Sequence, residues 1–291
     1  MLSDKMDQTE TIANADIPIS AAQLPVLSTS DTMALERVEL RYFVQRLKSL
    51  TPDQWEAPTR QPNRDVHAVV AHVAGSYALQ SNLRQIGRQI DPRVHRFYRT
   101  PGQSLEDAFV RVQIGDRLYW RPERLIAEIE STGERAIRLR SLLLRPLQRV
   151  STEQFTRQLW IRRRLSAQAH LLDLWLHRLE VADATGTSLI TNNAHDRQIF
   201  EATIASVAVK IERELASRRI DLTITGLSNV RYQFGIGEEP TSSISISTMT
   251  LAKRIAGWHS PAATRERSTI QGDVRTAMEL LKLLTTIHKE K

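Results

Sequence analysis

The chain has 291 residues, no cysteine, and a formal net charge of +7 from 40 Lys+Arg and 33 Asp+Glu. This length suits one large or two ordinary domains, and 41% hydrophobic with 25% charged residues is the balance of a globular protein. The lack of cysteine excludes disulfides, zinc–thiolate sites, iron–sulfur clusters and cysteine nucleophiles. A metal must therefore bind through His, Asp or Glu, and thiol chemistry needs a thiol from outside.

Positive charge is concentrated between Arg84 and Arg178, a stretch with 19 arginines, no lysine and 10 acidic residues. Such a stretch could attract nucleic acid, anionic lipid or a small acidic substrate. Its arginines are scattered along helix-like sequence, with Arg162-Arg163-Arg164 as the one tight run, and no zinc-finger spacing or aromatic RNA-binding motif accompanies them. We therefore favour solvated helix faces over a nucleic-acid interface.

The sequence shows no targeting or membrane segment. No apolar run approaches the ~18–20 residues of a membrane span. The first thirty residues also lack the basic-then-apolar order of a signal peptide. We expect a cytoplasmic protein without membrane contact, and the sequence leaves a homodimer open.

The first two thirds of the chain have helical periodicity. Residues 1–30 are rich in Ser, Thr, Asp and Ala without a period, which predicts a flexible N-terminal arm. Ser104 is a predicted helix N-cap, and Gly186 follows the end of a helix. The apolar spacing predicts helices over about 32–50, 64–89, 104 onward, 122–144, 166–184 and 194–217.

The pattern then changes to that of short strands. Residues 221–226, 230–235 and 242–247 alternate or are β-branched between Gly and Pro, and a further strand is predicted near 268–271. Helices are predicted near 251–256 and over 273–288. We predict an α+β fold with three parts: the arm over 1–30, a helical bundle over 31–190, and a connecting helix with a small α+β domain over 191–291.

The helix predicted over 166–184 is apolar in most directions, with Arg178 as the one interruption. Its polar or small residues fall within an arc of ~80°: Ser166, His170, Asp173, His177, Glu180 and Ala184. The helix is either buried on most sides with this stripe facing an internal cavity, or deeply packed with the stripe facing solvent. The segment alone favours the solvent face.

Asp173 and His177 are four residues apart, so their side chains project together and could bind one cation. A tight site needs a third ligand from another helix. His72 is a candidate, because the small residues Ala71 and Gly75 beside it permit a close approach of helices. As an isolated observation, a lone histidine in such a position is more often structural than a ligand.

Two longer motifs include these residues. The first, over 55–75, combines Trp55 and Pro58-Thr59 with a helix ending in Ala71-His72-Val73-Ala74-Gly75. The second, over 169–186, has an acidic residue four before a histidine, a further acidic residue, and small residues closing in Gly186. Together they resemble the signatures of the DinB-like, mycothiol-dependent maleylpyruvate isomerase family. Residues 251–257 and 271–273 resemble the sterol-carrier-like domain that is often attached to such bundles.

The resemblance implies a DinB-like four-helix bundle followed by a small α+β sterol-carrier-like domain. It also implies a divalent metal ion, usually zinc, on His72, Asp173 and His177, with one position open for water or substrate. In the family that position takes the thiol of a low-molecular-weight cofactor, mycothiol or a similar thiol. Its thiolate attacks an electrophilic substrate, giving isomerisation or S-transfer, and the arginine-rich stretch could steer an anionic substrate to the site.

His170 and Glu180 are candidate catalytic residues in the same segment. His170 stands where relatives commonly have Arg, and is a candidate fourth ligand or water-orienting residue. Glu180 is the second acidic residue of the signature, and Asp173 stands where the family usually has Glu. We therefore predict a metal-dependent thiol transferase or isomerase; the alternative is a non-enzymatic small-molecule or lipid carrier.

Overall fold

The computed structural model describes residues 18–59, 61, 63–98, 105–147, 167–187, 194–215, 217–226, 230–255 and 257–284. The predictions for residues 1–17, Ser104, 162–164 and Ser166 lie outside these ranges. The described residues form helices and one mixed sheet, in agreement with the predicted α+β class. They divide into a helical unit, Ser28–Leu189, and an α+β unit, Met1–Leu27 with Ile190–Lys291.

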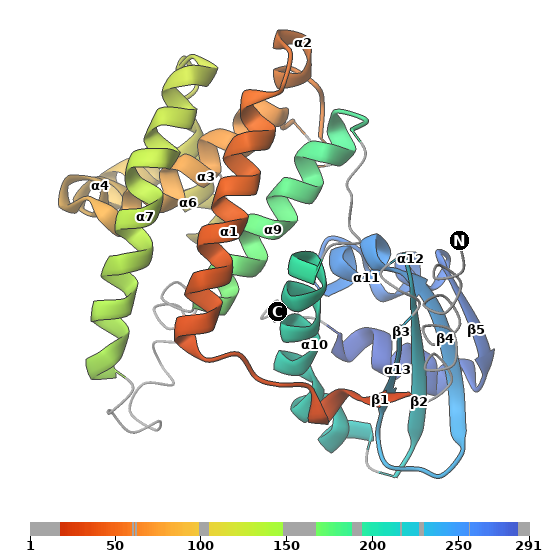
Figure 1. The fold of residues 1–291 in the computed structure, drawn as a ribbon. Coiled ribbons are helices and arrows are strands. Elements are labelled where there is room, and N and C mark those ends of the chain that lie inside the picture. Colours follow the sequence, from red (N-terminus) through yellow and green to blue (C-terminus); the bar gives the residue numbers. More distant parts are fainter. Residues whose placement is uncertain are drawn as a thin grey trace, which may run out of the picture. The chain divides into compact units, whose positions relative to one another are not determined.

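Four long helices dominate the helical unit: α1 (Thr29–Lys48), α3 (Val66–Ser81), α7 (Pro122–Leu147) and α9 (Ala167–Ala184). Each packs against two of the others, in the cyclic order α1, α7, α3, α9 (Figure 1). Their apolar faces enclose one core that includes Phe43, Val70 and Ile129. The unit also contains the shorter helices α2 (Pro52–Trp55), α4 (Leu83–Ile90), α5 (Pro92–Tyr98) and α6 (Leu105–Gly115).

The single helix predicted over 64–89 is wrong, because the structure has two helices that meet at Asn82. The Asn82 backbone is extended (φ −139°, ψ 115°), and its Oδ1 accepts a hydrogen bond from the Arg84 N–H at 2.9 Å. Asparagine side chains compete in this way with helical backbone hydrogen bonds and cap the next helix. The apolar period does not reveal such a break, which gives α4 a direction of its own (Figure 1).

Three short helices that the sequence analysis missed begin at a proline. These are α2, α5 and, in the α+β unit, α12 (Pro261–Arg265). Pro52 and Pro92 follow shortly after the helices predicted over 32–50 and 64–89, where a proline can also mark the end of a helix. Proline also suits the first turn of a new helix, because the N–H that it lacks would have no partner within that helix.

Two buried ion pairs connect α1 to its neighbours. Arg178 Nε on α9 donates to Glu39 Oε1 at 2.6 Å. Arg140 on α7 donates to Glu36, whose carboxylate also accepts a hydrogen bond from the Tyr77 hydroxyl at 3.1 Å. All five side chains are buried. Part of the arginine-rich stretch is therefore paired inside the unit.

The α+β unit contains a five-stranded sheet with the order β1-β3-β2-β4-β5. Its strands are β1 (Ile19–Ser20), β2 (Arg219–Thr225), β3 (Val230–Phe234), β4 (Pro240–Ser247) and β5 (Ser268–Gly272). The pairs β1–β3 and β2–β4 are parallel and the others antiparallel. Strand β1 lies within the predicted N-terminal arm: Ile19 pairs with Tyr232, so this part of the arm is an ordered edge of the sheet.

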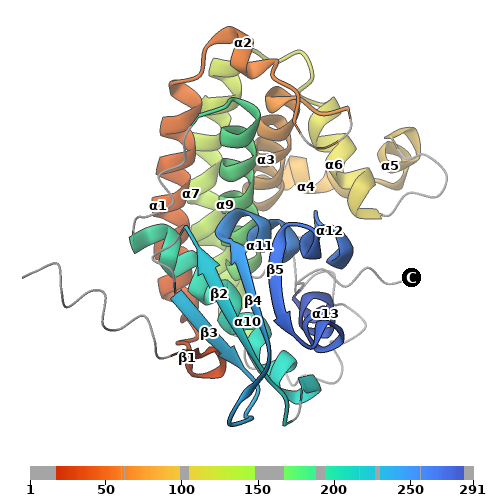
Figure 2. The same ribbon diagram turned by 90° about the vertical axis from the view of Figure 1, so that its right-hand side faces the viewer.

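One face of this sheet is apolar because its strands alternate. Leu222 lies between Tyr232 and Ile244 in the register of the three central strands. Helices α10 (Ala194–Leu215) and α13 (Val274–Leu283) pack against the sheet (Figure 2), and α11 (Thr248–Ile255) follows β4 directly. None of the described helices of the chain combines the length and apolarity needed to cross a membrane.

We predict that Arg178→Met destabilises the helical unit by about 3 kcal/mol, because it leaves the Glu39 carboxylate buried without this guanidinium. Urea unfolding followed by tryptophan fluorescence measures the effect, since four of the five tryptophans lie within residues 28–189. The double variant Glu39→Leu/Arg178→Met should recover most of the loss. Equal stability of Arg178→Met and the wild type would contradict the assigned role of the pair.

Candidate metal centre

Three side chains from α3 and α9 converge in the helical unit: His72, Asp173 and His177. One potential ligand atom of each lies within 4.8 Å of the other two. His177 Nε2 is 3.6 Å from Asp173 Oδ1, and the His72 and His177 rings meet edge to face with centroids 5.1 Å apart. The sequence brings Asp173 and His177 together by helical spacing, whereas His72 reaches them because α3 packs against α9.

The stripe of polar residues on α9 passes from solvent into the interior. The Asp173 side chain is 53% exposed, while those of His177 and Glu180 are only 6% and 4% exposed. The solvent-face interpretation therefore holds for Asp173 and is wrong for the two residues that follow it on the stripe. The helix ends as predicted, with Gly186 in the left-handed conformation (φ +62°).

Each of the two imidazoles has a hydrogen-bond partner at Nδ1. His72 Nδ1 lies 2.7 Å from Gln113 Oε1 of α6, and His177 Nδ1 lies 3.1 Å from Glu180 Oε2, one turn along α9. Oxygen acceptors at Nδ1 leave Nε2 as the nitrogen of each ring that can bind a metal ion. The sequence analysis missed Gln113, because nothing in its spacing relates it to a histidine 41 residues earlier.

The two histidines have opposite pKa shifts. Burial, together with the neighbouring His177, lowers the pKa of His72 to about 4. Burial would also lower the pKa of His177, but the carboxylates of Asp173 and Glu180 outweigh it and raise that pKa. At neutral pH His72 is therefore an uncharged imidazole, the form that binds metal ions.

His170 lies one turn before Asp173 and is not among the three converging residues. Its Nδ1 is 3.4 Å from Gln80 Nε2. His170 and Asp173 line a shallow surface hollow together with Val73, Ser76, Tyr77 and Leu174. The structure thus separates the two candidate catalytic residues: His170 is at the hollow beside Asp173, whereas Glu180 is buried behind His177.

The donor set fits a divalent cation. Two imidazole nitrogens and one carboxylate are a ligand set of catalytic zinc sites, and they also suit iron(II). Ligands around a tetrahedral ion with bonds of 2.0–2.1 Å are about 3.3 Å apart, so a separation of up to 4.8 Å requires a small closure. The distance of 3.6 Å between Asp173 Oδ1 and His177 Nε2 is already close to the tetrahedral value.

Comparison with known proteins gives a likeness in fold. No protein-family model matches the sequence, and no curated protein matches it. The crystal structure of the mycothiol-dependent maleylpyruvate isomerase is similar, with 14% identity and a TM-score of 0.47, as is that of a histidine-to-alanine mutant of it, with 16% and 0.46. Each comparison covers 85% of this chain and 95% of the other. The likeness is one of fold at low sequence identity.

We predict that the chelator-treated protein loses stability between pH 7 and pH 4.5 through His72. The pKa of His72 falls from 6.5 to about 4 on folding, so protons bind the unfolded chain more tightly, and stability present above pH 6.5 is lost as the pH falls toward 4. Urea unfolding at a series of pH values measures this loss. The loss of unfolding free energy should be smaller in His72→Gln than in the wild type. Parallel plots of unfolding free energy against pH for the two proteins would refute the assignment of this loss to His72.

Proposed function

We propose that this protein is a metal-dependent thiol S-transferase or isomerase that uses a low-molecular-weight thiol, mycothiol or a similar one. The observation that carries the proposal is the convergence of His72, Asp173 and His177 within 4.8 Å, with both imidazoles held at Nδ1. The sequence motifs that contain these residues support the same reaction class.

A few residues would have separate roles in the proposed site. His72, Asp173 and His177 would hold the ion, and Glu180 would orient His177 through its Nδ1–H. A bound divalent ion lowers the pKa of a coordinated thiol, so that the thiolate is available at neutral pH. No cysteine of the chain can compete with the visiting thiol for the ion, because the sequence has none.

The 53% exposure of the Asp173 side chain supports access of small molecules to the site. Asp173 belongs both to the converging triad and to the hollow, whose other polar residues are Ser76, Tyr77 and His170. We propose that His170 acts here, as a fourth ligand or by orienting water. Arg64 is close enough to lower the pKa of both triad histidines. This positive charge favours an anionic electrophile as the substrate.

Three finer assignments complete the proposal. Zinc is the proposed metal, because two histidines and one carboxylate leave a tetrahedral position open. The four packed helices are proposed to be a DinB-like bundle, on the strength of the two sequence motifs. The α+β unit is proposed to be sterol-carrier-like, because the motif over 251–257 begins in α11 and the motif over 271–273 includes the end of β5 in its mixed sheet.

We predict that the purified wild type carries about one divalent metal ion per chain and that His72→Ala and His177→Ala lose most of it. Metal analysis after gel filtration measures the content. His67→Ala is the matched control: His67 is on the same helix as His72, but its Nε2 contacts the Trp120 carbonyl at 2.7 Å. A wild type without metal, or variants that keep it, would exclude the site; a co-purified lipid in metal-free protein would support the carrier alternative.

We predict that thiols bind at the open metal position. Titration of the cobalt(II)-loaded protein with mycothiol should produce a sulfur-to-cobalt charge-transfer absorption, and His67→Ala should respond in the same way. An S-methylated thiol is the control, because it cannot form a thiolate. If mycothiol, glutathione and cysteine all leave the spectrum unchanged, the metal site stands but the proposed thiol chemistry does not.

A further inference from the structure

Two buried glutamines continue the hydrogen bonding of His72 away from the site. Gln113 Oε1 faces His72 Nδ1 at 2.7 Å, and Gln113 Nε2 donates to Gln89 Oε1 at 2.9 Å. Gln89 Nε2 in turn donates to the backbone carbonyl of Gly75 at 3.0 Å. Both glutamines are buried, at 1% and 0% exposure, so water does not replace these partners. This series of hydrogen bonds begins at His72 and ends at Gly75, and both residues lie on α3.

The donor and acceptor roles in this series of hydrogen bonds are fixed at its last member, the carbonyl of Gly75. A backbone carbonyl can only accept, so Gln89 must present its NH₂ group to Gly75 and its oxygen to Gln113. Gln113 must then present its NH₂ group to Gln89 and its oxygen to His72. An oxygen at 2.7 Å requires a proton on His72 Nδ1. Neutral His72 therefore carries its proton on Nδ1 and has its lone pair on Nε2.

We propose that Gln113 and Gln89 are positioning residues that set the tautomer of His72 and thereby prepare Nε2 as a metal ligand. This inference rests on the proposed metal site for its purpose, although the tautomer itself is a property of the metal-free protein. Metal-bound histidines generally donate their second N–H to an oxygen acceptor. Here that acceptor is a neutral amide, whose orientation is controlled by a second amide and a carbonyl.

Two local features allow the chain of bonds to form. Gln89 and Gly75 are 14 residues apart, which in one continuous helix would separate them by about 21 Å. The break at Asn82 lets α4 fold back so that the two are in contact. Gly75 is also required by space, because a Cβ there would lie 2.6 Å from both Cβ and Cγ of Gln113.

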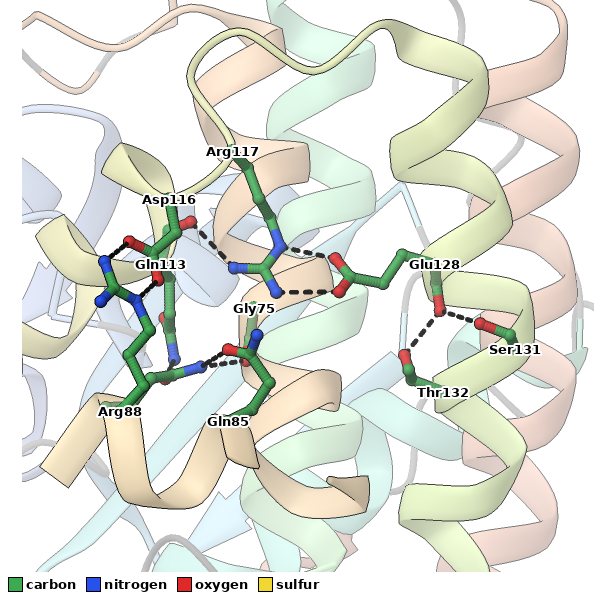
Figure 3. A network of polar contacts seen from close by, with 10 residues as sticks. Gly75, Gln85, Arg88, Gln113, Asp116, Arg117, Glu128, Ser131 and Thr132 are labelled. Carbon is green, nitrogen blue, oxygen red and sulfur yellow. Dashed lines mark hydrogen bonds and ion pairs between the residues drawn. The ribbon is translucent and has the colours of Figure 1, made fainter. Parts of the chain in front are cut away.

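Ion pairs hold the helices that carry the glutamines (Figure 3). Arg117 donates to the Gln113 carbonyl at 3.2 Å and to both oxygens of Glu128 at 2.5 and 2.9 Å, which ties α6 to α7. Arg88 makes two hydrogen bonds of 2.5 Å to Asp116, which ties α4 to α6. The Arg117 side chain is only 1% exposed, so this support lies inside the unit.

The test is the tautomer of His72 in the metal-free full-length protein at pH 7, read from ¹⁵N–¹H correlations of the imidazole. The wild type should show the Nδ1–H form. Gln113→Met and Gln89→Met should each show a mixture with the Nε2–H form, and a roughly 10–100-fold weaker zinc affinity in competition with a chelator. Arg84→Met is the matched control, because its exposed side chain lies on α4 away from these bonds, and it should match the wild type in both measurements.

Gly75→Ala provides a second route that leaves both glutamines in place. It should displace Gln113, shift His72 toward the Nε2–H form and weaken zinc binding. Gly87→Ala is its control, because a Cβ at Gly87 meets no atom within 4 Å. An Nδ1–H tautomer retained in folded Gln113→Met and Gln89→Met would overturn the inference. A wild type that shows the Nδ1–H form without binding zinc would instead refute the proposed function and leave the tautomer assignment standing.

Discussion

The helical unit depends on one constraint: polar side chains buried between its helices must find hydrogen-bond partners there, because burial without them costs several kcal/mol. The unit meets much of this constraint with cross-helix pairs. Arg178 contacts Glu39, Arg140 contacts Glu36, and His72 contacts Gln113. These contacts join α1 to α9, α1 to α7 and α3 to α6. Apolar packing brings the helices together, and the buried pairs fix how they are aligned.

The same constraint accounts for the opposite behaviour of the two imidazoles. His177 lies near two carboxylates, and their charge outweighs the burial that would lower its pKa. His72 has an amide as its close partner, so burial dominates and its pKa falls to about 4. Burial and the neighbouring His177 thus keep the His72 ring uncharged, while the nearby carboxylates favour the charged form of His177.

The sequence predicts those parts of the site that lie within one helix. Asp173, His177 and Glu180 follow from helical spacing, and the small residues beside His72 indicate a close helix approach. The inward direction of the α9 stripe could not be predicted, because the same pattern suits a solvent face. Gln113 and Gln89 could not be found either, since only the packing of α3, α4 and α6 places them near His72. The α+β class followed from periodicity, whereas β1 is too short to give a period.

The break at Asn82 shows why helix boundaries matter for the chemistry. An uninterrupted helix over 64–89 would satisfy the apolar period equally well, yet Gln89 would then lie about 21 Å from Gly75 along the helix axis. His72 would keep its place opposite Asp173 and His177, but Gln113 would lose the group that orients its amide. The ligand set alone therefore does not specify a working site. In this fold the capping preference of one asparagine and the missing side chain of one glycine decide which nitrogen of His72 faces the candidate metal position.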